Sequence, residues 1–169
     1  MFQVVRRFYR LLGALSAVAL VSTFVFVILG VVARTAGWDI PGLDSYAGYA
    51  IAAALFLALP STLQRGDHIR VTLVLDRLPS AGKSILEWWS LLAAFGLSAY
   101  VSWYAARLVW DSYVMHDISP AADATPLWIP QLAMALGCAG LSIAFGHALM
   151  ARRRGESFIE VSDEASHVE

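Results

Sequence analysis

Four long apolar runs separated by short polar stretches dominate the hydrophobic pattern of the 169-residue chain. The runs without charged residues cover residues 11–33, 45–64, 88–106 and 124–151. An α-helix needs about 20 residues to cross the hydrocarbon core of a bilayer, and backbone groups in lipid must be hydrogen-bonded within their own segment. The pattern therefore predicts an all-α integral membrane protein with transmembrane helices at about 11–33, 45–64, 86–108 and 128–150, in a single domain over residues 1–154.

Composition supports a bilayer as the solvent of this chain. Hydrophobic residues make up 59% of it and charged residues 15%, against roughly 45–50% and about 25% in soluble domains. The arginines flank apolar runs and form no basic groove, so nucleic acid is not an expected partner. Residues 11–33 follow a basic arm, as a signal peptide would, but the usual apolar region of a signal is only about 7–15 residues long. We expect a retained helix.

Basic residues alternate between the polar stretches. Three arginines precede the first run, four basic residues lie between the second and third runs, and three arginines follow the fourth. The stretch after the first run contains Arg34 as its only basic residue. The stretch after the third predicted span contains aspartates but no lysine or arginine. By the positive-inside rule, both termini are predicted to be cytoplasmic. Residues 155–169 are acidic and weakly hydrophobic, which predicts a disordered tail.

Residues that could carry chemistry are few and scattered. Cys138 is the only cysteine, so an internal disulfide and a cysteine-rich zinc site are excluded. His147 has no second histidine within an apolar run with which to bind a haem. We therefore predict no catalytic, cofactor-binding or metal-binding residues, and no enzyme activity. Arg107 can pair with Asp111 one helical turn later, and Glu87 is either a boundary charge or a polar contact to another helix.

Small residues form a stripe along the fourth run. They recur every three or four positions, which places them on one helix face: Ala133, Gly137, Gly140 and Ala144. Small side chains let helix backbones approach closely in lipid. The stripe fits helix packing inside this chain, and it also fits docking onto another membrane protein.

The stretch RGDHIRVTLVLDRLP, residues 65–79, interrupts the apolar pattern between the second and third runs. Asp67 can cap a short helix, and Val71, Val74, Leu75 and Leu78 would share one face of it. Alternating residues in the same stretch also fit a strand, and a plain basic loop is a third interpretation. We favour a short interfacial amphipathic helix with its charged face towards headgroups or water.

This stretch resembles a motif in the small membrane subunit of tripartite ATP-independent periplasmic (TRAP) transporters. That motif reads Arg–Gly–acidic–His–Ile–Arg–Val–acidic, followed by leucines and Asp-Arg-Leu-Pro, and Thr72 replaces its second acidic residue. Arg34 and Asp44 match an arginine at the exit of the family's first span and an acidic residue before the second. The length and the four-helix topology with both ends inside are also similar.

The resemblance implies a supporting subunit of a sodium-coupled secondary transporter in the bacterial inner membrane. In such a system a periplasmic binding protein captures an organic anion, often a carboxylate, and a large multi-span subunit transports it. The small subunit packs on the large one and helps to dock the binding protein. The expected partner interface on the periplasmic side is Arg34, Trp38 and Asp44. The expected partner and phospholipid interface on the cytoplasmic side is Arg65, Asp67, His68, Arg70, Asp76 and Arg77.

Two other functions remain open from the residues alone. A self-sufficient small transporter or channel acting as a homo-oligomer would fit the four spans, although such a function usually requires a charged group deep in a span. A membrane enzyme or electron-transfer subunit would have to rely on His147 and Cys138.

Overall fold

The computed structural model describes residues 2–38, 40–65 and 80–154. In these residues four helices are found: α1 (Phe2–Ala36), α2 (Leu43–Arg65), α4 (Ser80–Val114) and α5 (Trp128–Arg153). All four are long and apolar enough to cross a membrane. The prediction of an all-helical protein with four potential spans is therefore confirmed.

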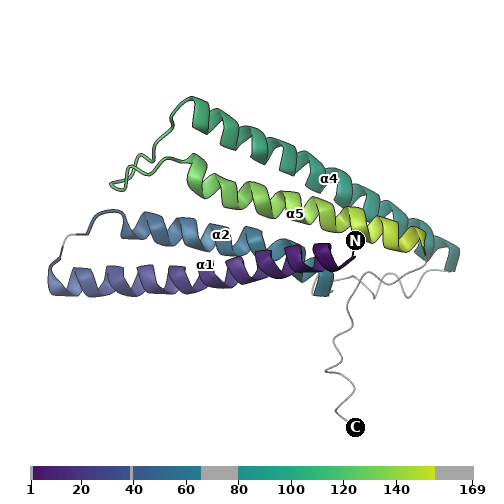
Figure 1. The fold of residues 1–169 in the computed structure, drawn as a ribbon, viewed down its shortest axis with the longest axis horizontal. Helices are drawn as coiled ribbons and strands as arrows, with labels where there is room; N and C mark the ends of the chain where they lie inside the picture. The colour runs from purple at the N-terminus through teal and green to yellow at the C-terminus, as the bar shows by residue number, and fades with distance from the viewer. Residues whose placement is uncertain (1, 39, 66–79, 155–169) are drawn as a thin grey trace, which may run out of the picture.

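The helices pack in the order α1–α2–α5–α4. The principal contacts join α1 to α2, α2 to α5, and α5 to α4, and Figure 1 shows α1 and α4 on the outer sides of this row. The α1–α2 turn and the α4–α5 loop, residues 37–42 and 115–127, lie at one end, which we call the loop end. The start of α1, the end of α2, the start of α4 and the end of α5 lie at the other, the termini end (Figure 1).

Small side chains and proline set the contact between α2 and α5. Gly137 of α5 lies against the backbone of Phe56, and Gly140 lies against Pro60 one turn farther along both helices. The two helices therefore run parallel at close range, as small residues permit. Pro60 is fully buried, and Ala144 is completely inaccessible to solvent.

Two outer helices extend beyond the predicted apolar spans. Helices α1 and α4 each contain 35 residues, which corresponds to about 52 Å at 1.5 Å per residue, against a hydrocarbon core of about 30 Å. The additional turns carry charged residues. Helix α1 includes the basic arm that precedes residue 11, and α4 begins at Ser80, before the third predicted span. The interfacial helix predicted within residues 65–79 lies outside the described residues except for Arg65, and the predicted tail of residues 155–169 lies outside them as well.

Candidate functional site at the loop end

Two glycines shape the turn between α1 and α2. Gly37 has a φ of +72° and ends α1, with the N–H of Trp38 bonded to the carbonyl of Ala33 at 2.8 Å. Gly42 has a φ of +84° immediately before α2, and its carbonyl accepts the N–H of Tyr46. Glycine adopts this left-handed backbone without the steric penalty of a Cβ. The sequence thus folds the first loop into a tight turn that brings the ends of α1 and α2 together.

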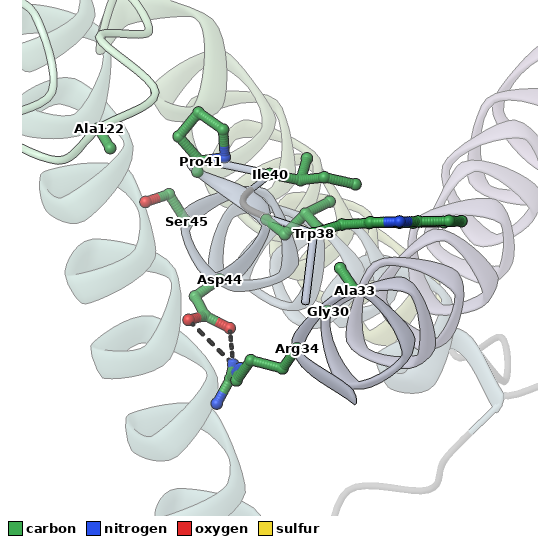
Figure 2. Close-up of a pocket in the computed structure, with 11 residues that line it drawn as sticks. Gly30, Ala33, Arg34, Trp38, Ile40, Pro41, Asp44, Ser45 and Ala122 are labelled. Atoms are coloured by element: carbon green, nitrogen blue, oxygen red, sulfur yellow. Dashed lines mark hydrogen bonds and ion pairs between the residues drawn. The ribbon is translucent and has the colours of Figure 1, made fainter. Parts of the chain in front are cut away.

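The predicted periplasmic residues Arg34, Trp38 and Asp44 line one open pocket at this turn, of about 360 Å³. One guanidinium nitrogen of Arg34 lies 3.1 Å from Oδ1 and 3.3 Å from Oδ2 of Asp44 (Figure 2). These two side chains are 74% and 88% exposed, so the ion pair contributes only about 0–1 kcal/mol to stability. Trp38 is also largely exposed. The pair and the indole are therefore displayed to solvent rather than used to hold the fold.

Asp123 fastens the α4–α5 loop to α2. Its Oδ1 accepts the hydroxyl of Ser119 at 3.0 Å, and its Oδ2 accepts the hydroxyl of Tyr49 at 3.2 Å and the N–H of Thr125 at 3.3 Å. A Cβ on Gly42 would lie 2.7 Å from the Cβ of Asp123. Only a glycine at position 42 therefore allows the second loop to approach this closely. We call Asp123 with Tyr49, Ser119 and Thr125 the Asp123 clamp.

The Asp123 clamp keeps its carboxylate ionised. Hydrogen bonding from Thr125 is the largest cause, desolvation opposes it, and the Ser119 hydroxyl contributes further, so that the pKa of Asp123 falls from 3.8 to about 2. A carboxylate that accepts several hydrogen bonds is stabilised in its charged form. Ala122, the residue before Asp123, lines the Arg34 pocket from the side of the second loop (Figure 2). The clamp therefore helps to form the wall of that pocket.

A second polar cluster lies at the termini end. Arg152 of α5 forms an ion pair with Glu87 of α4, each side chain being 30% exposed. The guanidinium carbon of Arg152 lies 5.8 Å from the ring centre of Trp88, and its Nη2 donates to Ser84 at 3.5 Å. A cation above an indole face is attracted by the ring quadrupole. Of the two interpretations of Glu87, the structure shows a polar contact to another helix, which ties α4 to α5.

The cytoplasmic residues that the sequence singled out are mostly beyond the described part of the chain. Arg65 is the last residue of α2. Asp67, His68, Arg70, Asp76 and Arg77 lie outside the described residues. Close to the termini end, Tyr9 Oη is hydrogen-bonded to His147 Nδ1 at 3.0 Å, which joins α1 to α5. His147 thus has a packing partner within this chain.

The small stripe of α5 faces α2. Gly137, Gly140 and Ala144 are buried, whereas Ala133 is partly exposed. A Cβ on Gly140 would lie 2.7 Å from Pro60 Cγ and 2.8 Å from Leu12 Cδ1, so α1, α2 and α5 meet at this glycine. At these positions the stripe is occupied by contacts inside the chain. Within the described residues, no group of three or more metal-ligating side chains comes together.

A comparison with protein families identifies the chain. Residues 23–155 match the family of tripartite ATP-independent periplasmic transporters, DctQ component. The chain belongs to this DctQ family. The match covers the last part of α1 and all of α2, α4 and α5, so it includes the loop end and most of the helix row. No curated protein and no solved structure matches the chain.

Membership of the DctQ family establishes the general role of the chain. It is the small subunit of a TRAP transporter, a system in which this component works with a large membrane subunit and a binding protein. With four helices able to span, it is a multi-pass protein of the inner membrane. The resemblance inferred from residues 65–79 is thereby confirmed at the level of the family.

Proposed function

We propose that this DctQ-family chain is the supporting subunit of a sodium-coupled importer of an organic anion of the carboxylate class. The family match carries the proposal. The arrangement of charge supports it, because Arg107 pairs with Asp111 at 3.7 Å and Glu87 pairs with Arg152 within the chain. Substrate and ion pathways are usually marked by ionisable residues deep in a span, whereas these two pairs lie towards the two ends of α4. Transport is therefore assigned to the large subunit, and this chain supports it.

In the proposed orientation both termini are cytoplasmic and the loop end is periplasmic. The support is the clustering of lysine and arginine before α1, between α2 and α4, and after α5. Cysteine-accessibility labelling tests it on the chain without Cys138. A single cysteine at exposed Thr35 should react with an impermeant maleimide added to spheroplasts, and one at exposed Arg153 should react only after lysis. The reverse result would invert the topology.

We assign Arg34, Trp38 and Asp44 to the docking of the periplasmic binding protein. Their exposure at one pocket and the position of the neighbouring second loop, which the Asp123 clamp attaches to α2, support this role. Trp38→Ala and Asp44→Ala should lower transport at limiting binding protein, while recovery of the large subunit stays at the wild-type level. Thr35→Ala is the matched control, since its hydroxyl bonds only to the carbonyl of Val32 in its own helix. Unchanged transport in both variants would remove the docking role.

The motif residues Arg65, Asp67, His68, Arg70, Asp76 and Arg77 are proposed to contact phospholipid headgroups and the large subunit at the cytoplasmic side. Basic residues next to a membrane are attracted to anionic lipids. Substitution of Arg70 and Asp76 should reduce assembly or transport while the chain still inserts. Full assembly and transport by the double variant would leave these residues with a topological role only.

The discriminating experiment for the whole proposal is co-purification followed by reconstitution. The tagged chain, extracted in mild detergent, should recover a much larger multi-span protein. Proteoliposomes that contain the chain alone should show no uptake, whereas addition of the large subunit and the binding protein should give sodium-dependent uptake of the anion. Transport by the chain alone would favour the alternative, a self-sufficient homo-oligomeric transporter or channel.

A further inference from the structure

The outward face of α4 differs in chemistry from the outward face of α1. It carries a stripe of residues spaced three, four or seven positions apart, together with one adjacent pair, and these positions share one side of the helix. We call it the α4 stripe: Trp89, Gly96, Tyr100, Trp103, Tyr104 and Arg107, all of them exposed. Helix α5 covers the opposite face of α4, where Ser98, Ala105 and Ser112 are buried. Within the described residues, no extensive contact covers the stripe.

Two tryptophans give the depth of this stripe in the membrane. Trp89 and Trp110 are both exposed on α4 and are 21 residues apart, which corresponds to about 31 Å along a helix. This spacing equals the roughly 30 Å thickness of the hydrocarbon core, and tryptophan concentrates at the two interfaces. Tyr100 lies almost midway between them. Its side chain therefore projects outward near the centre of the bilayer.

Tyr100 and Tyr104 need polar partners at that depth. They are 61% and 51% exposed, and their rings pack together with centres 4.6 Å apart. Within the described part of the chain, neither hydroxyl has a hydrogen-bond partner. Lipid tails offer none, and an unpaired hydroxyl in hydrocarbon costs free energy. These two hydroxyls therefore indicate a protein surface opposite them rather than lipid.

Helix α1 provides the contrast within the same molecule. Its apolar run, residues 11–33, contains no tyrosine or tryptophan, and its exposed side chains are aliphatic or phenylalanine. Each hydroxyl of that run has a partner, because Ser16 bonds to Ala54 O, and Ser22 and Thr23 bond to carbonyls of α1 itself. This face is suited to lipid. Of the two outer helices, therefore, only α4 has exposed hydroxyls in its span that lack a partner among the described residues.

Gly96 makes the α4 stripe suitable for another helix. A Cβ at Gly96 would meet nothing within 4 Å, so no contact inside the chain explains a glycine there. Exposed small residues in a span allow a second helix to approach closely, and Tyr100 lies one turn farther along the same face. The space at Gly96, next to the hydroxyls of Tyr100 and Tyr104, fits a second helix that brings polar side chains or backbone carbonyls to the middle of the bilayer.

We propose that the α4 stripe is the surface on which the large TRAP subunit docks, through a helix that packs at Gly96 and pairs with the hydroxyls of Tyr100 and Tyr104. The inference rests on the proposed function, in which the large subunit is the membrane partner. The unpaired hydroxyls of Tyr100, near the midplane, and of Tyr104, one turn farther, favour a protein over lipid, and Arg107 and Asp111 continue the same face towards the loop end. The large subunit is the membrane partner that the family provides. Helix α1 remains in contact with lipid.

The test compares two glycines that are both free of neighbours in this chain. The full chain is co-expressed with the large subunit of its own transporter, and the amount of large subunit recovered in mild detergent is measured. Gly96→Leu should reduce recovery roughly tenfold, because a packed helix contact is overfilled. Gly48→Leu on α2 is the control, since a Cβ there also meets nothing within 4 Å, and it should leave recovery unchanged. Equal recovery with both variants would overturn the proposal.

A second measurement does not depend on the stability of a variant. A photo-reactive benzoylphenylalanine at Trp103 should crosslink to the large subunit, and the same probe at exposed Val18 on α1 should not. The substitutions Tyr100→Phe and Tyr104→Phe together should reduce recovery roughly fivefold or more, since a net hydrogen bond is worth about a fivefold change. Crosslinking from Val18 instead, or from Trp103 only to a second copy of this chain or to lipid, would overturn the assignment. Failure of the wild-type chain to recover any large subunit would instead overturn the proposed function itself.

Discussion

Replacing Gly137 by alanine should force α2 and α5 apart. Pro60 has no N–H, so the carbonyl of Phe56, four residues earlier, lacks its usual partner within α2. The hydrogen of Gly137 that a Cβ would replace points at this carbonyl oxygen, and the Cβ itself would lie 2.5 Å from the carbonyl carbon and 2.9 Å from Phe56 Cβ. Because the nearest obstructing atoms are backbone, no side-chain rotation relieves the overlap. Carbon atoms settle near 3.5 Å, so the helices must separate locally by about 1 Å.

The expected loss of stability follows from three contributions. Overfilling a packed site costs roughly 1–3 kcal/mol, and loss of the Cα–H···O contact to the Phe56 carbonyl costs roughly 0.5–1 kcal/mol. The better helix propensity of alanine returns up to about 1 kcal/mol. The free energy of unfolding should therefore fall by about 0.5–4 kcal/mol.

Unfolding of the purified chain in mixed micelles with increasing SDS measures this loss, followed by tryptophan fluorescence and by helical circular dichroism. Gly48→Ala and Gly96→Ala are the matched controls, because a Cβ at either position meets nothing within 4 Å. Both controls should equal the wild type or exceed it by up to about 1 kcal/mol. A Gly137→Ala protein as stable as these controls would refute the contact between Gly137 and the Phe56 carbonyl.

Three further predictions concern polar contacts between helices. Tyr9→Phe should lower the unfolding free energy by about 1 kcal/mol, the net worth of one hydrogen bond, and an unchanged value would mean that the bond to His147 contributes nothing. Arg152→Met should destabilise the chain by an amount between the roughly 0–1 kcal/mol of exposed ion pairs and the roughly 3–5 kcal/mol of broken buried ones. Addition of Glu87→Gln should recover part of that loss, and strict additivity in this double-mutant cycle would deny the pairing. The pKa of Asp123 is lower in the folded chain, about 2, than its ordinary 3.8, so its stabilisation is complete above about pH 4 and is lost as the pH falls towards 2. Limited proteolysis of the α4–α5 loop should accelerate in that window for the wild type, and Asp123→Ala should be cleaved quickly at every pH, whereas equal cleavage of the two proteins at neutral pH would contradict a role of the carboxylate in holding the loop.

Local patterns in the sequence predicted the helices well because a bilayer constrains them strongly. Four uncharged runs are sufficient to predict four spanning helices. The Arg107–Asp111 pair was also predictable, since it needs only helical spacing, and the structure confirms it at 3.7 Å. The resemblance of residues 65–79 to a TRAP motif predicted the family that the comparison identifies.

Contacts between residues distant in the sequence were not predictable in the same way. From the sequence, Asp123 was recognisable only as an acidic residue of the third polar stretch. No local pattern links it to Tyr49, which lies 74 positions earlier. The pairing of Glu87 with Arg152 likewise depends on α4 and α5 lying side by side. A glycine just before a helix can indicate a positive φ, so this feature of Gly42 was predictable from the sequence. The close approach of Asp123 to Gly42 was not.

The order of the helices limits how this chain can bind a larger membrane protein. The small stripe of α5 was compatible with packing inside the chain or with docking, and Gly137 and Gly140 now have neighbours on α2 and α1. Those glycines therefore are not available for a close approach by another protein. Because α2 and α5 occupy the middle of the row, the outer helices α1 and α4 each have one side with no neighbouring helix among the described residues. Of these two helices, α1 meets the requirements of lipid with aliphatic side chains, whereas α4 presents a glycine and unpaired phenols that lipid cannot satisfy. That difference supports the proposed docking of the large subunit on α4, with α1 left in contact with lipid.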